Sequence, residues 1–355
     1  MFSKDRSTRV FSLLSVAVLC GLLWSIAGAA QLAETGSTLL LPLMNTWVDA
    51  YRQHDPSTQI TTEGSGSGAG IARAIAGDVQ IGASDAYMSD AQMKATPMLN
   101  IPLAISAQQV DYNVPEIGPA HLNLSGPVLA AIYSGTVEFW DDAQIAGLNA
   151  VVAKKLPHAR IIPVKRAEGS GDTFIFTQYL SETTPSWKNG PGFGTKITWP
   201  AVASVIVATG NPGMVAICQS TKYSLAYIGI SFLTQTNAAG LGYAALRNRD
   251  GKFVLPSPES IGAAVSATVE RTPRDARISL IDAPGAASYP IINYEYAIVK
   301  PQQADKAVAA DLKKFLDWTI APDGGQRQDY LSGVHFVPLP SSIVNISRAQ
   351  IARIE

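Results

Sequence analysis

The chain has 355 residues, of which 47% are hydrophobic and 15% are charged, and its formal net charge at pH 7 is -1. This length exceeds what one hydrophobic core usually serves, so we expect two lobes. The balanced charge, without a long run of one sign, argues against a nucleic-acid partner and a disordered tail. Any anion that the chain binds must therefore be held at a local site.

The N-terminus has the order of parts of a secretory signal peptide. Basic residues precede an apolar run over 10–26, and small residues follow it. We therefore expect export to the periplasm or cell envelope. An uncleaved anchor and a lipoprotein signal at Cys20 remain alternatives, so membrane attachment stays open. Cleavage after Ala29 or Ala30 would leave Cys218 as the single cysteine, so we expect no internal disulfide.

Beyond the signal, the hydrophobic pattern alternates between helical and strand-like segments, which indicates an α/β protein. The strand-like segment "VQIGASD" is notable because it ends on a carboxylate, Asp85. In chain order, the expected elements are a helix around 43–51, a strand over 59–64, a helix over 70–77, strands over 79–85, 204–210 and 226–233, and a helix over 310–320.

Three turns rich in Gly, Ser and Thr each precede a helical pattern. A helix N-terminus has unpaired N–H donors and a partial positive charge, and small residues before it let an anion approach the backbone. Helix capping alone explains any single turn, but three of them, one beside Arg166, favour an oxyanion site. The turns are "ETGSTLLLPLMNTW" (34–47), "EGSGSGAGIARAI" (63–75) and "RAEGSGDTFIFTQYL" (166–180).

Other binding motifs explain these turns less well. Gly64, Gly66 and Ala69 fit the G-x-G-x-x-A dinucleotide fingerprint, with Asp85 about 20 residues further on, but this alternative leaves the other two turns unexplained. No Gly-Lys-Ser/Thr of a P-loop and no G-x-S-x-G nucleophile elbow is present. The four histidines lack ligand spacing, so we expect neither a metal nor a cofactor.

The sequence resembles the PstS-like family of extracytoplasmic phosphate-binding proteins, which serve ABC-type phosphate importers, and within it the actinobacterial, mycobacterial-like branch. The resemblance covers the whole mature chain. It rests on the segments "GSTLLLPL", "GSGSGAGIA", "IGASDAYMS", "GSGDTFIFTQYL", "GMVAIC" with "AYIGISFL", and "YPIINYEYAIV".

The resemblance implies a two-lobed α/β periplasmic-binding-protein fold of type II, with the ligand in the cleft between the lobes. Residues 1–30 would form the signal peptide. Lobe I would comprise 31–112 plus 291–355 and lobe II 113–290, joined by crossings near 112–115 and 289–293. Closure of the two lobes would then assemble the site and exclude water.

The resemblance also implies a set of phosphate-binding residues on the three turns and after the strand-like segment 79–85. Phosphate keeps at least one proton at neutral pH, so a dry pocket must offer acceptors as well as donors. Aspartates would accept the phosphate O–H groups, while N–H groups, hydroxyls and an arginine would donate to its oxygens. Capping of a helix or strand end remains the alternative role for either aspartate. The implied residues are Thr38, Leu39, Ser67, Asp85, Arg166, Ser170, Gly171 and Asp172.

The chain departs from its relatives at two positions. Many relatives have threonine where this chain has Asp172, and Ser224 stands where the mycobacterial-like members place a second cysteine. The expected function is binding of inorganic phosphate by a monomeric, non-enzymatic protein that delivers it to the membrane permease of an ABC importer. An exported enzyme acting on phosphate esters is the alternative, but it would need an activated nucleophile or a metal cluster.

Overall fold

The computed structural model of the chain describes residues 30–355, so the predicted signal peptide lies outside the described residues except for Ala30 at its end. The described part is a mixed α/β structure around a nine-stranded sheet, confirming the predicted fold class. In spatial order the strands are β2 (Thr58–Thr61), β1 (Ala30–Gly36), β3 (Ile81–Ser84), β12 (Ile292–Val299), β4 (Leu99–Tyr112), β8 (Ser224–Gly229), β6 (Ile162–Arg166) and β7 (Ile206–Ala208), and β9 (Gly242–Tyr243) pairs with β4.

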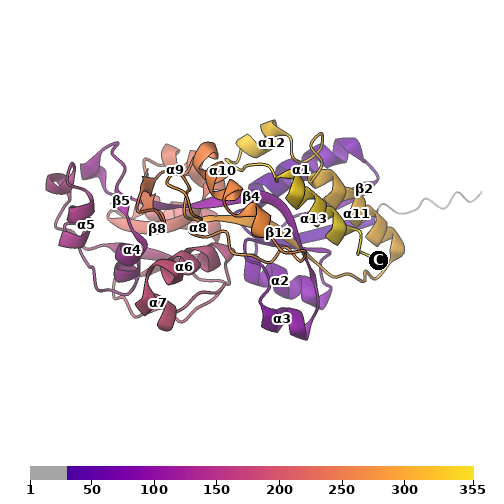
Figure 1. The fold of residues 1–355 in the computed structure, drawn as a ribbon, viewed down its shortest axis with the longest axis horizontal. Helices are drawn as coiled ribbons and strands as arrows, with labels where there is room; N and C mark the ends of the chain where they lie inside the picture. The colour runs from indigo at the N-terminus through magenta and orange to yellow at the C-terminus, as the bar shows by residue number, and fades with distance from the viewer. Residues whose placement is uncertain (1–29) are drawn as a thin grey trace, which may run out of the picture.

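Strand β4 connects the two halves of the sheet. It pairs antiparallel with β12 along 99–107 and with β8 along 108–112, and all its residues are buried. On one side β1, β2 and β3 run parallel to one another, and on the other side β6, β7 and β8 do so. Figure 1 shows the elongated molecule that results, with β4 and β12 in the middle and helices around both ends.

Both ends of the described chain build the same half of the molecule, where the indigo and yellow helices of Figure 1 lie together. Helices from the C-terminal part pack on β1 and β4, and Trp47 Nε1 donates to the carbonyl oxygen of Gly325 at 2.8 Å. The helices of this half are α1 (Leu41–His54), α2 (Ser67–Ala76), α3 (Asp90–Ala95), α11 (Lys306–Thr319), α12 (Gln328–Ser332) and α13 (Ser341–Ile351).

The other half is formed by the middle of the chain. Its central helix, α6 (Gly171–Thr183), is buried on nearly all sides, as expected of a core helix without a polar face. A small sheet, β11 (Phe253–Val254), β10 (Ala245–Arg247) and β5 (Asn123–Leu124), lies at this end. The remaining helices are α4 (Gly126–Tyr133), α5 (Ala143–Leu148), α7 (Pro185–Asn189), α8 (Gly210–Ser220), α9 (Leu233–Ala238) and α10 (Pro258–Ser266).

The segment 226–233 differs from its prediction as a single strand. Strand β8 ends at Gly229, and a 3₁₀ turn over Ile230–Phe232 leads directly into α9. Gly229 N–H donates to the side chain of Asn211 at 2.8 Å, and Ser231 Oγ donates to the carbonyl oxygen of Leu39 at 2.8 Å. These bonds to other elements replace the ladder that would extend the strand.

Cys218 on α8 is the only cysteine among residues 30–355, and it is free and buried. Ser224 Oγ lies 3.2 Å from the sulfur of Cys218. Ser224 is the position where the similar proteins have a second cysteine, and it lies next to Cys218, as the resemblance implies. Burial raises the pKa of the Cys218 thiol to about 12, which keeps it protonated and unreactive.

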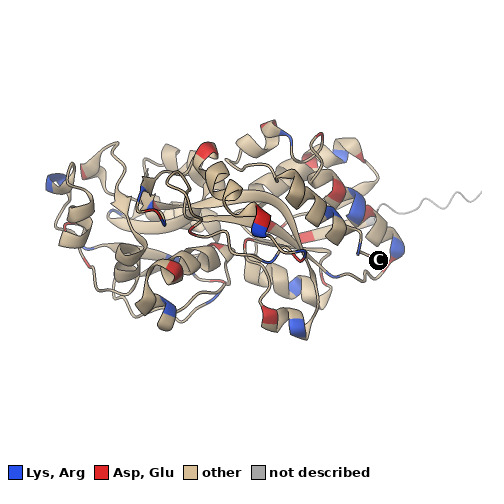
Figure 2. Ribbon diagram, viewed as in Figure 1, with Lys and Arg blue, Asp and Glu red and all other residues tan. Residues whose placement is uncertain are grey.

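Charged residues of both signs are scattered along the ribbon in Figure 2, without a large region of one sign. This distribution agrees with the net charge of -1. Charge that matters for an anion must therefore be sought inside the molecule.

Candidate functional site

The first predicted turn connects β1 to α1. It requires glycine at position 36, where φ is +143° and a side chain would collide with the backbone of β3. Ser37 Oγ accepts the N–H of Leu39 at 3.1 Å and donates to Asp85 Oδ1. The predicted donor Leu39 N–H thus bonds within its own turn, whereas Thr38 contacts residues from the other half of the molecule.

The second turn leads into α2, which begins at Ser67 after Gly66 with φ +90°. Ser67 Oγ accepts the backbone N–H of Asp85 at 3.2 Å and lies 3.3 Å from its Oδ2, to which it can donate. Gly68 N–H donates to the carbonyl oxygen of Gly169 at 2.9 Å. The second turn therefore lies directly against the third, although about 100 residues separate them in sequence.

The third turn runs from the end of β6 to the start of α6 and carries Arg166, whose side chain is only 1% exposed. Its Nη1 donates to Asp172 Oδ2 at 2.5 Å, its Nη2 to Thr38 Oγ1 at 3.2 Å and its Nε to Glu168 Oε1 at 2.7 Å. Ser170 Oγ accepts an N–H of the first turn of α6 at 3.3 Å, which is the role of a helix cap.

Two further donors to Asp172 were not predicted. Asn211 Nδ2, at the start of α8, donates to Asp172 Oδ2 at 2.8 Å and to Thr38 Oγ1 at 3.0 Å. Gln108 Nε2, on β4, donates to Asp172 Oδ1 at 3.1 Å. The turn "ATGNPG", which leads into the start of α8, is a fourth turn of the predicted kind and could have identified Asn211, but Gln108 lies inside a strand and has no local signal.

The structure thus brings the predicted residues to one buried place, from both halves of the molecule. Leu39 N–H and Ser170 Oγ bond within their own turns, and the other six are next to one another. Those six are Thr38, Ser67, Asp85, Arg166, Gly171 and Asp172.

The two aspartates are surrounded by donors. Asp172 accepts from Arg166, Asn211 and Gln108, and Asp85 accepts from Ser37 and Ser67. An ionised carboxylate offers about four acceptor positions. Each aspartate therefore keeps acceptor capacity that these donors do not fill. Because the Asp85 side chain is buried inside the cluster, it is also out of place for the ribose that the dinucleotide alternative requires.

Burial and mutual repulsion set the charges of the cluster. Burial, followed by the charge of Asp172, raises the pKa of Asp85 to about 7. Burial also raises the pKa of Asp172, although Arg166 opposes that shift. Burial by itself would lower the pKa of Arg166, but the charges of Asp172 and Glu168 raise it above its ordinary value, so the guanidinium stays charged.

Thr38 accepts hydrogen bonds from the other half of the molecule and also keeps a donor of its own. Its Oγ1 accepts from Arg166 Nη2 and from both the backbone N–H and the amide of Asn211. Its own hydroxyl proton has no acceptor in the described part of the chain, so it is available to an oxygen of a ligand. The cluster and the N–H groups at the starts of α2, α6 and α8 can donate to an oxyanion. The two carboxylates can accept from the O–H groups of that oxyanion.

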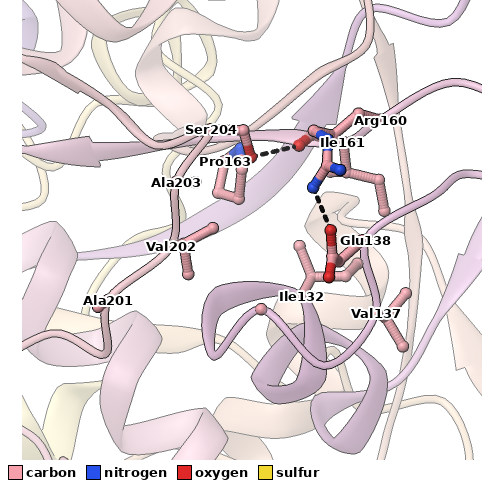
Figure 3. A pocket seen from close by; sticks show the side chains of 11 residues that line it. Ile132, Val137, Glu138, Arg160, Ile161, Pro163, Ala201, Val202, Ala203 and Ser204 are labelled. Atoms are coloured by element: carbon pink, nitrogen blue, oxygen red, sulfur yellow. Dashed lines mark hydrogen bonds and ion pairs between the residues drawn. The ribbon is translucent and has the colours of Figure 1, made fainter.

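A separate cavity of about 240 Å³ lies between α4 and the segment around 201–204 (Figure 3). Arg160 bonds to Glu138, and Ser204 Oγ donates to the carbonyl oxygen of Ile161 at 2.8 Å. The rest of its lining is mostly aliphatic. This cavity shares no residue with the cluster.

Two features of residues 30–355 bear on other functions. These residues hold no group of three or more His, Cys, Asp or Glu side chains arranged to bind a metal ion. Over the same residues, no helix has both the length and the apolar character that crossing a membrane requires.

Comparison with known proteins places this cluster in context. Residues 25–323 match the family model described as the PBP superfamily domain. A protein named phosphate-binding protein PstS from Methanocaldococcus jannaschii is 36% identical over 331 residues, which cover 88% of this chain and 83% of that protein. Phosphate-binding protein PstS 3 from Mycobacterium leprae is 30% identical, over 90% of this chain and 85% of its own length.

Solved structures agree on the fold. A high-affinity periplasmic phosphate-binding protein, PfluDING, has a TM-score of 0.72 at 20% identity, covering 90% of this chain and 93% of that one. A phosphate-binding protein from Stenotrophomonas maltophilia has a TM-score of 0.69 at 19% identity, covering 90% and 94%. At these identities the similarity establishes a shared fold.

Proposed function

The chain belongs to the family of PstS phosphate-binding proteins, and from this membership we propose that it binds inorganic phosphate outside the cytoplasmic membrane with high affinity. It then delivers the ion to the permease subunits of an ABC-type importer. The observation that carries this proposal is the buried cluster in which Arg166 and hydroxyl donors surround two carboxylates with remaining acceptor capacity. Export by residues 1–30 brings the chain to the compartment that this role requires.

The chemistry of phosphate fits this mixture of donors and acceptors. Asp85, held by Ser67, and Asp172 accept the O–H groups of the ion, while Thr38 and Arg166 donate to its oxygens. Fully ionised sulfate has no proton to give, so it would leave both carboxylates repelled and without a partner. Proton recognition therefore supplies selectivity that charge attraction alone cannot.

Titration calorimetry of the purified protein with phosphate and with sulfate tests the proposal. We expect tight binding of phosphate and no measurable binding of sulfate. Absence of phosphate binding would overturn the proposed function. No observation on the described residues favours an enzyme, so we propose no second function.

The two lobes are proposed to be 31–112 plus 291–355 and 113–290, with closure over the ligand. Strand β4 pairs with both halves of the sheet, which supports the first crossing. The segment 289–293 leads into β12, which pairs with β4, and this supports the second crossing. Tyr289 Oη donates to the carbonyl oxygen of Gln108 at 2.8 Å, which ties the two crossings together. Contacts such as Gly68 to Gly169 would break on opening.

Phosphate is accordingly expected to reduce the radius of gyration in solution. Ligand contacts from both lobes stabilise the closed form, whereas the free protein samples open forms. Small-angle X-ray scattering with and without phosphate measures this change, and sulfate serves as the matched control. Identical curves in all three conditions would contradict closure by the two lobes.

Gly171→Ala is expected to weaken phosphate binding by roughly ten- to a hundredfold. A methyl group at this position would overlap Asp85 Oδ2 and Ser67 Oγ, and overpacking of this kind costs about 1–3 kcal/mol. Gly147→Ala is the matched control, because a side chain there meets nothing within 4 Å. Calorimetry should separate the two variants, and equal affinities would place Gly171 away from the closed site.

A further inference from the structure

Behind Asp85 lies a third carboxyl group, that of Glu295 on β12, which is fully buried. Its Oε1 accepts from Ser106 Oγ at 2.5 Å and from Asn293 Nδ2 at 3.1 Å. Its Oε2 is buried and has no donor among the described residues. Asn293 Nδ2 also donates to the carbonyl oxygen of Asp85 at 3.3 Å, and the neighbouring residues Tyr296 and Ser84 are paired in the sheet, so the two carboxyl groups of Glu295 and Asp85 lie beside each other.

A hydrogen bond between two carboxyl groups needs one proton, because two carboxylates are both acceptors and would repel. The surrounding donors indicate which group carries it. Both oxygens of Asp85 face serine hydroxyls, from Ser37 and Ser67, whereas one oxygen of Glu295 faces none. The proton therefore belongs on Glu295 Oε2.

The electrostatics agree with this assignment. Burial, then the charge of Asp85 and the hydrogen bond to it, raise the pKa of Glu295 well above its ordinary value. The bond from Glu295 acts in the opposite sense on Asp85 and lowers its pKa. The pair thus loses its first proton from Asp85 and keeps the second on Glu295.

We propose that Glu295 is a positioning residue that stays protonated and donates its O–H to Asp85, so that Asp85 can only accept from the ligand. With Ser37, Ser67 and Glu295 as donors, three of about four acceptor positions of Asp85 are filled. The remaining position fits one ligand O–H. This inference rests on the proposed function, because it requires a protonated oxyanion as the ligand.

The charged groups around the pair determine the sign of its pH dependence. Glu295 on β12 faces Asp85, which follows β3. Its other hydrogen-bond partners, Ser106 on β4 and Asn293 on β12, are neutral. Beyond Asp85, the other charged residues of the cluster are Asp172, Arg166 and Glu168. Loss of the Glu295 proton at high pH would add a buried negative charge beside Asp85 and repel phosphate.

Glu295→Gln tests the inference, because glutamine keeps the shape and a donor but cannot ionise. We expect the ratio of variant to wild-type phosphate affinity to rise about tenfold between neutral pH and the alkaline range in which Glu295 loses its proton, the effect of roughly one pKa unit of coupling. The ionisation of phosphate itself is common to both proteins and cancels in this ratio. A ratio of affinities that does not change with pH would overturn the role of Glu295.

Glu34→Gln is the matched control. Glu34 is a second buried glutamate, with a pKa raised by burial to about 8 and no donor to either oxygen among the described residues, and it lies outside the cluster. The affinity ratio of this variant to wild type is expected to stay constant with pH. A change equal to that of Glu295→Gln would attribute the effect to loss of a buried charge in general, and would also overturn the inference.

Infrared spectroscopy gives a readout that does not depend on phosphate. The wild-type protein at neutral pH should show a carbonyl band of a protonated carboxylic acid that Glu295→Gln lacks. Glu34, with a pKa of about 8, gives such a band too, so the difference between the spectra of wild type and Glu295→Gln is the measurement. If this difference contains no protonated-acid band, Glu295 is ionised and the inference fails. If the difference contains the band but wild type does not bind phosphate, the proposed function fails instead.

Discussion

Arg166→Ala is expected to weaken phosphate binding at least about tenfold and to lower the free energy of unfolding by about 3–5 kcal/mol. The affinity falls because charge-assisted bonds to the anion contribute roughly 1.5–3 kcal/mol. From the sequence alone, only this loss of affinity is expected. The structure adds the loss of stability, because the guanidinium compensates buried Asp172 and partly buried Glu168.

The double variant Arg166→Ala with Asp172→Asn separates the two effects. It should recover most of the stability, since the uncompensated charge of Asp172 is removed, but not the affinity. Arg160→Ala is the control, because Arg160 pairs with Glu138 on the surface, where such pairs contribute about 0–1 kcal/mol. Calorimetry and denaturant unfolding measure both quantities. Unchanged phosphate affinity of Arg166→Ala would remove this residue from the site.

The sequence predicted the turns of the site well because their signals are local. Glycine and serine before a helical pattern mark the ends of β1 and β6 and the starts of α2 and α6, where φ values such as +90° at Gly66 exclude most other residues. The carboxylate after β3 was also visible, because a buried strand that ends on Asp85 is unusual.

The rest of the site depends on tertiary structure and has no local signal. Gln108 and Glu295 lie within fully buried strands, where a polar residue only interrupts the apolar pattern and does not indicate a site. Their roles arise from the pairing of β4 with β8 and β12. The end of β8 at Gly229 was missed for the same reason, since its N–H bonds to Asn211 on another element.

Changing both aspartates to asparagine is expected to reduce the preference for phosphate over sulfate, by as much as about 10⁴–10⁵ if both carboxylates read ligand protons. Asparagine keeps the size, but it can turn its NH₂ group toward the anion, which relieves the repulsion of sulfate. Each single variant should lose part of the preference, with sulfate binding gained as phosphate binding changes. Calorimetry with both anions measures the ratio.

The pH dependence of binding gives a second test of the aspartates. Phosphate loses the O–H groups that they read as pH rises, so affinity should fall on the alkaline side. Asp85 has a raised pKa of about 7, so it is ionised above that value and neutral below it. A neutral Asp85 accepts less well, so affinity should decline by no more than about tenfold per pH unit below about pH 7. Asp85→Asn should lack this acid-side decline.

The role of Asp172 in ligand recognition is easier to contradict than that of Asp85, since Asp172 also lies in the first turn of α6 and forms an ion pair with Arg166. Both of those roles predict a lower melting temperature for Asp172→Asn, so stability cannot distinguish them from ligand recognition. Anion selectivity can. If Asp172→Asn melts earlier yet keeps the wild-type phosphate affinity, pH profile and rejection of sulfate, then Asp172 only holds the arginine and the helix start. Asp85, supported by Glu295, would then be the group that recognises the proton.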